Sequence, residues 1–217
     1  MISENLREFK ASLPAGVTLV AVSKTKPPEL IMQAYSAGQR IFGENRVQEL
    51  LKKQALLPGD IAWHQIGHLQ TNKVKQIAPF IDMIQSVDSL HLMKEIEKRA
   101  EQCQRKIPCL LQVHIAKEES KSGFSRHDIL SIFQSGEAQK MQHITLRGLM
   151  GIATLTDDKA QLRQEFSELA ALFKKIRNSY VPAFDTLSMG MSGDYKLAIE
   201  KGSNMIRIGS AVFGERR

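Results

Sequence analysis

The feature that most constrains this chain is a regular alternation of short apolar runs with longer amphipathic stretches. Eight apolar runs occur, at residues 17–23, 40–43, 61–67, 81–87, 108–115, 145–151, 184–189 and 204–208. Several of them are apolar at both odd and even positions, as in parallel strands that are covered on both faces. Helical patterns lie between the runs, for example at residues 28–37, 90–104, 126–134 and 158–176. Asp157 or Asp158 is a candidate N-cap for the last of these helices.

Eight strands that alternate with helices over 217 residues predict a (β/α)8 TIM barrel, at roughly 27 residues per unit. An amphipathic helix at the N-terminus precedes the first strand. A doubly wound open sheet is the alternative, because it is built from the same strand–helix units. No linker rich in Pro, Gly or Ser divides the chain, so we expect one domain over residues 1–217. With only two cysteines, Cys103 and Cys109, we expect a cytoplasmic protein without a disulfide framework.

The charge of the chain narrows the classes of partner. The formal net charge is +7, from 30 basic and 23 acidic residues, which favours an anionic ligand. The basic residues are scattered, and the aromatic content of 6% is low for a protein that stacks single-stranded nucleic acid. No apolar run approaches the roughly 20 residues of a membrane span. We therefore expect no nucleic acid and no membrane as partner, and instead one focused site for an anion.

Lys24 is the first candidate for chemistry, because functional residues of such barrels lie at the C-terminal ends of the strands. It directly follows the first apolar run. A partly desolvated lysine near other cations has a lowered pKa and can act as an imine-forming nucleophile. The alternative is a lysine whose amine simply reaches solvent. Lys26 is a weaker candidate, since it belongs to the loop before the next helix.

Two loops of small residues follow the seventh and eighth runs, at residues 188–194 and 207–211. Their backbone N–H groups, with the hydroxyls of Ser192 and Ser210, can converge on an anion, and barrel enzymes often hold phosphate at this place. Glycines such as Gly209 allow the close backbone approach that this requires, although glycines also merely end strands. A nucleophilic lysine beside a phosphate site is what pyridoxal phosphate (PLP) needs, because it carries an aldehyde and a phosphate.

Seven motifs extend this interpretation to a family resemblance. They are VAVSKTKP (20–27), FGENRVQE (42–49), WHQIGHLQTNK (63–73), SKSG (120–123), RGLM (147–150), LSMGMS (187–192) and IRIGSAVFG (206–214). In this order they resemble the pyridoxal phosphate homeostasis protein family, over nearly the whole chain. The fold of that family resembles the N-terminal barrel of alanine racemase without the second domain of the racemase.

The resemblance implies a function and a set of site residues. It implies a PLP-binding protein of intracellular PLP homeostasis, which buffers the cofactor or delivers it to apo-enzymes with little or no catalysis, and which we expect to be a monomer. Lys24 would hold PLP as a Schiff base, and Arg207 would face the pyridine nitrogen. The remaining implied contacts are Ser192, Gly209 and Ser210 to the phosphate, with Asn45 and Met150 lining the cofactor.

Arg207 also bears on whether the protein is an enzyme. Because arginine stays cationic, a pyridine nitrogen that faces it stays unprotonated and is a poor electron sink. A low-activity PLP-dependent amino-acid racemase is the main alternative, and it requires one base on each face of the substrate. Lys24 is one candidate base, and Tyr195 is the other unless it is an ordinary helix residue. A barrel that binds RNA or protein without a cofactor is a third alternative.

Three further polar residues are candidates for a role outside the cofactor contacts named above. His64 and His68 are four residues apart, which invites a zinc interpretation, but no third ligand accompanies them. We therefore expect no metal. Lys121, after the fifth strand, either contacts the cofactor or a partner or lies in a solvated turn.

Overall fold

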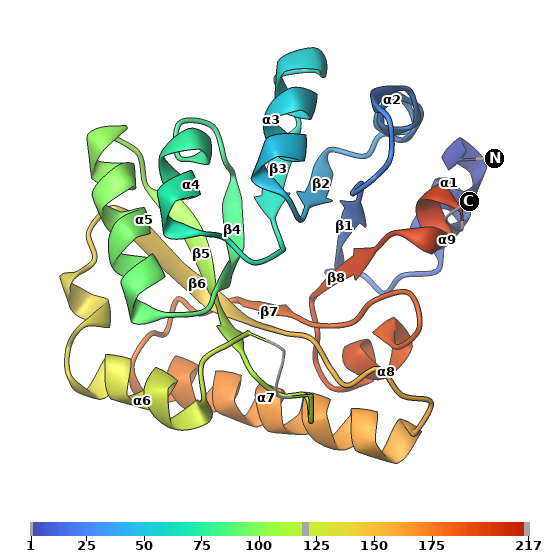
Figure 1. The fold of residues 1–217 in the computed structure, drawn as a ribbon. Helices are drawn as coiled ribbons and strands as arrows, with labels where there is room; N and C mark the ends of the chain where they lie inside the picture. The colour runs from blue at the N-terminus through green and yellow to red at the C-terminus, as the bar shows by residue number, and fades with distance from the viewer. Residues whose placement is uncertain (1, 119–121, 215–217) are drawn as a thin grey trace.

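Eight parallel strands close into a barrel in a computed structural model that describes residues 2–118 and 122–214 (Figure 1). Each strand pairs with its neighbours in the chain, and the last strand pairs with the first. The strands are β1 (Thr18–Val22), β2 (Ile41–Glu44), β3 (Ala62–Gln65), β4 (Met83–Val87), β5 (Ile107–Val113), β6 (Ile144–Gly151), β7 (Thr186–Ser188) and β8 (Met205–Ile208). The predicted (β/α)8 barrel is confirmed, and the pairing of β8 with β1 excludes the open sheet.

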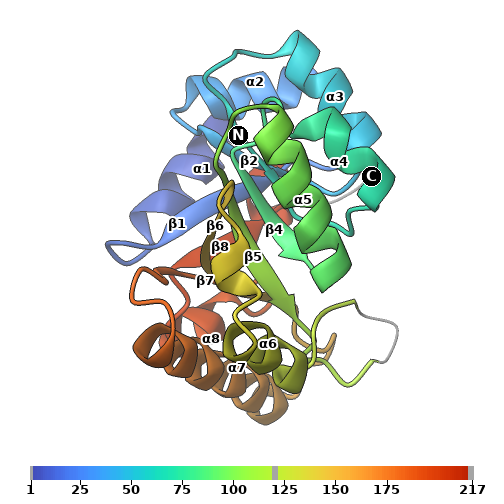
Figure 2. The same cartoon turned by 90° about the vertical axis from the view of Figure 1, so that its left-hand side faces the viewer.

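The helices lie around the outside of the barrel (Figures 1 and 2). They are α1 (Ile2–Ala11), α2 (Pro28–Ser36), α3 (Val47–Leu56), α4 (Thr71–Ile77), α5 (Leu90–Gln102), α6 (Arg126–Gln134), the short 3-10 helix η1 (Ala138–Lys140), α7 (Lys159–Ser179), α8 (Tyr195–Glu200) and α9 (Ser210–Phe213). Asp158 caps α7, since its carboxylate accepts hydrogen bonds from two backbone N–H groups of the first turn. This helix continues three residues beyond the predicted end at 176. The prediction stopped too early because residues 177–179 are exposed and add no apolar residue to the helical pattern.

The core has two layers, which follow from the alternation of side chains along each strand. A cluster in the lumen of the barrel consists of Val20, Met83, Leu110, Met150 and Met205. A larger cluster fills the space between the strands and the surrounding helices, and its largest fully buried side chains include Phe42, Phe166 and Phe184. The larger cluster thus packs the helices against the outside of the barrel. The smaller cluster fills the lumen below the end of the barrel where the strands terminate.

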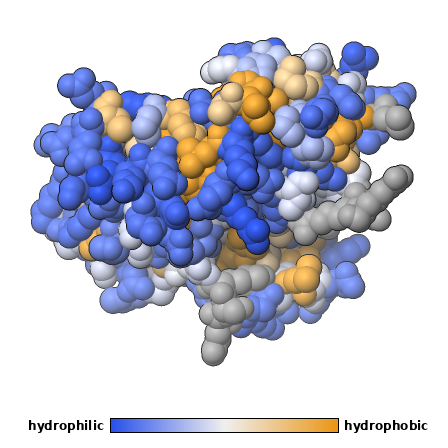
Figure 3. All heavy atoms as spheres, turned by 45° about the horizontal axis from the view of Figure 1, so that its top comes forward, coloured by the Kyte–Doolittle hydropathy of each residue, from blue (hydrophilic) through white to orange (hydrophobic). Residues whose placement is uncertain are grey.

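The outer surface is largely polar. The face drawn in Figure 3 is mostly hydrophilic, with a smaller group of hydrophobic residues between the charged ones. At one side of the barrel α1 lies beside α9, so the two ends of the described chain come close together (Figure 1). None of the helices that the structure describes is long and apolar enough to cross a membrane.

A β-bulge interrupts the pairing of β6 with β5. The register between β5 and β6 shifts so that Cys109 pairs with Leu146 and the next residue pairs with Gly148, which leaves Arg147 as the extra residue. Gly148 in turn pairs with Thr186 of β7. A Cβ atom at Gly148 would lie 1.6 Å from the Thr186 carbonyl oxygen, so only glycine allows this close approach.

Gly148→Ala is therefore expected to lower the free energy of unfolding by about 3 kcal/mol, because the backbone of β7 must shift to admit the methyl group. The matched control is Gly59→Ala, since a Cβ atom there meets nothing within 4 Å. Denaturant unfolding of the two variants measures the difference. Equal stability of both variants would show that the strands tolerate the shift.

Candidate functional site

A cavity of about 310 Å³ lies where β1, β7 and β8 end, and we call it the Lys24 cavity. It is lined by Val22, Lys24, Lys26, Met191, Ser192, Gly193, Arg207, Gly209, Ser210 and Gly214. Five of the residues singled out in the sequence for a PLP site are thus brought together from distant parts of the chain. An amine lies among them with a guanidinium, two hydroxyls and a glycine backbone, which suits an anionic ligand that also carries an aldehyde.

Lys24 lies in a tight turn directly after β1. The Lys26 N–H closes this turn by donating to the Ser23 carbonyl at 3.0 Å. Thr25 has a φ of +63°, in the left-handed region that β-branched residues avoid at a cost of about 1–2 kcal/mol. Its N–H donates to Oε1 of Glu49 at 2.6 Å, which fixes the strained residue. The turn therefore holds the half-buried Lys24 in a defined direction.

A buried ion pair lies behind this turn. The Lys53 ammonium, on α3, donates to Oε1 of Glu44 at 2.6 Å, to Oε1 of Glu49 at 2.7 Å and to the Ser23 carbonyl at 2.7 Å. The side chains of Glu44 and Lys53 are 0% and 5% exposed. Burial raises the pKa of Glu44, and the hydrogen bond from Lys53 acts against that shift. The cluster was not predicted from the sequence, although Glu49 and Lys53 have the i,i+4 spacing of a helical ion pair.

Arg207 points from β8 into the lumen and is 4% exposed. Its guanidinium donates to Oγ of Ser188 at 2.6 Å and to the Gly151 carbonyl at 2.8 Å. Burial lowers the pKa of Arg207 to about 10, and the charge of Asp194 opposes the shift. The guanidinium is therefore still a cation at neutral pH, with its orientation fixed by two acceptors.

Hydrogen bonds between polar side chains continue from Arg207 and Ser188 across the lumen. The Ser188 hydroxyl donates to Oε1 of Gln85 at 2.7 Å, and Nε2 of Gln85 is 2.8 Å from Nδ1 of His64. Burial lowers the pKa of His64 to about 4, so the ring is neutral and Nδ1 is the acceptor in this pair. The two histidines considered as zinc ligands have different partners. Whereas His64 contacts Gln85, Nδ1 of His68 lies 2.8 Å from a carboxylate oxygen of Asp88, so the two rings do not form one metal site. Within residues 2–118 and 122–214, three or more His, Cys, Asp and Glu side chains nowhere gather as a metal site would need.

The loops after β7 and β8 form the other end of the Lys24 cavity. Gly190 has a φ of +100°, and a Cβ atom there would lie 2.7 Å from Cβ of Ala198, so the loop that carries Ser192 requires glycine. Gly209 and Ser210 stand at the start of α9, where the first N–H groups have no acceptor within the helix. Both residues line the cavity, so the start of this helix is available to donate to an anion there.

Two of the predicted contacts lie elsewhere. Of the residues that the structure describes, those that line the Lys24 cavity do not include Asn45 or Met150. The Asn45 carbonyl accepts a hydrogen bond from Gln65 at 3.0 Å in the loop after β2, whereas Met150 is fully buried in the lumen cluster. Both residues were implied by the family resemblance alone, and their contact with the cofactor stays a prediction. Lys121 lies outside the described residues.

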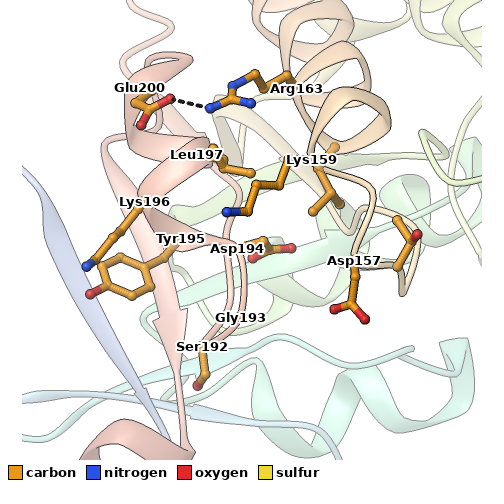
Figure 4. A pocket seen from close by; sticks show the side chains of 12 residues that line it. Asp157, Lys159, Arg163, Ser192, Gly193, Asp194, Tyr195, Lys196, Leu197 and Glu200 are labelled. Atoms are coloured by element: carbon orange, nitrogen blue, oxygen red, sulfur yellow. Dashed lines mark ion pairs between the residues drawn. The ribbon is translucent and has the colours of Figure 1, made fainter.

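A second cavity of about 570 Å³ adjoins the first and shares Ser192 and Gly193 with it (Figure 4). Tyr195 lines this second cavity, as the first residue of α8, and does not line the Lys24 cavity. Its ring packs against Phe9 of α1, with 5.2 Å between the ring centroids. Tyr195 is therefore a helix residue packed against the N-terminal helix.

Known proteins are similar to this chain in sequence and in fold. The family described as alanine racemase, N-terminal domain, matches residues 1–217. The pyridoxal phosphate homeostasis protein of Pasteurella multocida is 41% identical over 208 residues, which are 93% of this chain and 88% of that protein. The structure of PipY from Synechococcus elongatus with PLP bound has a TM-score of 0.91 at 37% identity, covering 99% of this chain and 100% of PipY. Alanine racemase from Clostridium difficile shares the fold, with a TM-score of 0.77, 15% identity and coverage of 99% of this chain and 56% of the racemase.

Lys53→Met is expected to lower the free energy of unfolding by about 3–5 kcal/mol at neutral pH, because it leaves the Glu44 carboxylate buried without its cation. Burial raises the folded-state pKa of Glu44 above its unfolded-state value, so the folded state is favoured when Glu44 is protonated. The loss of stability relative to wild type should therefore shrink near pH 5 and grow toward pH 8. Urea unfolding at both pH values measures it. The control is Lys52→Met, whose side chain is exposed. A loss that is the same at both pH values would contradict a charged Glu44–Lys53 pair.

Proposed function

The chain belongs to the pyridoxal phosphate homeostasis protein family, and on that premise we propose that its Lys24 cavity binds PLP covalently. The observation that carries the proposal is the convergence of Lys24, Arg207 and Ser210 on one cavity. The residues fit the cofactor, since an amine can meet an aldehyde while hydroxyls and backbone N–H groups meet a phosphate. PipY, a relative with the same fold, is known with PLP bound.

The covalent step is a condensation at Nζ of Lys24. The neutral amine adds to the aldehyde carbon, a carbon–nitrogen double bond forms, and the aldehyde oxygen leaves as water. No oxidant or reductant is needed, and water reverses the step. The product is a Schiff base on Lys24, held at its far end by Ser192, Gly209 and Ser210.

Reversible binding suits a role in PLP homeostasis. Free PLP condenses with any exposed amine, so a protein that sequesters the aldehyde protects other proteins from it. Because water or an incoming amine can reverse the bond, the same site can release PLP to apo-enzymes. We propose buffering and delivery as the function, carried out by a monomer in the cytoplasm.

Bound PLP supplies an electron sink for chemistry at an amino-acid α-carbon, and three features of the chain limit its use. Arg207 is a buried cation, so a pyridine nitrogen that faces it stays unprotonated. Tyr195, the candidate second base, packs against Phe9 and lines the other cavity. Nζ of Lys26 is 3.4 Å from the Phe213 carbonyl and 3.3 Å from that of Gly214, so this lysine donates to backbone. These features favour a carrier over an amino-acid racemase.

Lys24→Ala is expected to weaken PLP binding at least about tenfold, or about 1.4 kcal/mol, because the covalent bond is lost. The matched control is Lys26→Ala, the other lysine of the cavity, with an affinity within about threefold of wild type. Titration with PLP, followed by absorbance, measures both.

A chiral assay on alanine and serine tests the racemase alternative. Turnover of about 1 per second or more that depends on Lys24 would contradict the carrier function.

The homeostasis role is tested in cells. Removing the protein is expected to raise free PLP and to disturb amino-acid pools, since the buffer is lost. Re-expression of the wild-type chain should restore both, whereas re-expression of Lys24→Ala should not. Pools of free PLP and of amino acids that do not respond to removal would contradict the role.

A further inference from the structure

We propose that Glu49 is a positioning residue for Lys24, acting through the backbone of the turn with the help of Lys53. The inference rests on the proposed function, in which Lys24 is the nucleophile. Glu49 does not line the Lys24 cavity, so it acts without touching the ligand. Glu49 is the last residue of the FGENRVQE motif and lies in the first turn of α3, so this role belongs to the part of the motif that follows β2.

Glu49 fixes the residue that follows Lys24. Its Oε1 accepts the Thr25 N–H at 2.6 Å and the Lys53 ammonium at 2.7 Å. The side chain of Glu49 is 26% exposed, so these two hydrogen bonds are partly shielded from water. A charged acceptor makes such bonds stronger than those between neutral groups.

Lys53 fixes the residue that precedes Lys24. Its three N–H donors meet three acceptors, namely the Ser23 carbonyl, Glu44 and Glu49, which satisfies the ammonium completely. The Ser23 hydroxyl also donates to Oε1 of Glu44 at 2.6 Å. The backbone is thus held on both sides of Lys24 by one cluster that joins the ends of β1 and β2 to α3.

The strain at Thr25 gives this arrangement its consequence for Lys24. A β-branched residue with a φ of +63° persists only where its surroundings hold it. Without the acceptor of Glu49, the turn relaxes toward a negative φ, and the Cα–Cβ direction of Lys24 changes with it. Glycine adopts a positive φ without strain. Thr25→Gly should therefore remove the need for the Glu49 acceptor. If Glu49 only stabilised the fold in general, Thr25→Gly would not compensate for its loss.

The experiment compares Glu49→Ala, Glu49→Gln and the double variant Glu49→Ala with Thr25→Gly. The control is Asp60→Ala, which removes an exposed ion pair with Arg40 at 2.9 Å, at the other end of the barrel. Two readouts are used on the full chain. One is the rate constant for adduct formation with PLP, and the other, which needs no cofactor, is amide hydrogen exchange of residues 21–26.

Glu49→Ala is expected to speed exchange in residues 21–26 and to slow adduct formation about tenfold, since small misplacement of a reacting group costs that much or more. Glu49→Gln keeps an acceptor oxygen and should stay within about threefold of wild type, as should the double variant. Asp60→Ala should change neither readout. These results together support the inference.

Three results would overturn it. Exchange that is unchanged in Glu49→Ala would show that Glu49 does not hold the turn. Faster exchange with an unchanged rate of adduct formation would show that Lys24 does not need the turn. A double variant as slow as Glu49→Ala would assign Glu49 another role. If the wild-type chain itself forms no adduct on Lys24, the proposed function fails, and the wild-type arm alone reveals this.

Discussion

Hydrogen bonding between β1 and β8 closes the barrel, and the Lys24 cavity depends on that closure. The register places Ala21 beside Ile208 and Val20 beside Arg207. The turn that carries Lys24 therefore lies next to the loop that carries Ser210, although nearly the whole chain separates them in sequence. Parallel pairing also directs both strand ends to the same face. An open sheet made from the same units would leave these two ends far apart.

Two buried polar clusters then orient the two charged groups of the site. Lys53 and Glu44 lie in the layer between the barrel and α3, behind the Lys24 turn. Arg207 and Ser188 lie in the lumen, where Gln85 extends their hydrogen bonding to His64. Burying such groups carries a cost in desolvation, and short hydrogen bonds to Lys53, to Oε1 of Glu44 and to Arg207 offset part of it. The cost is borne where a fixed amine and a fixed guanidinium are needed.

The sequence was informative wherever a local signal has one structural outcome. The eight apolar runs correspond to the eight strands, and several of them have the pattern of a parallel strand that is covered on both faces. The rule that function lies at strand ends brought out Lys24, Ser192 and Ser210. Buried charges were missed because a lysine on a helix, such as Lys53, is exposed in most proteins. The bulge that leaves Arg147 without a register partner on β5 has no local signal, since it arises from pairing between strands.

The central claim is that Lys24, among all the lysines of the chain, reacts with PLP. Peptide mass mapping after incubation with PLP and reduction with borohydride tests it most directly, because reduction makes the bond permanent and the mass locates it. The account predicts one dominant phosphopyridoxyl adduct, on the peptide that contains Lys24. Label spread evenly over surface lysines, or no label at all, would contradict the account and leave only the barrel.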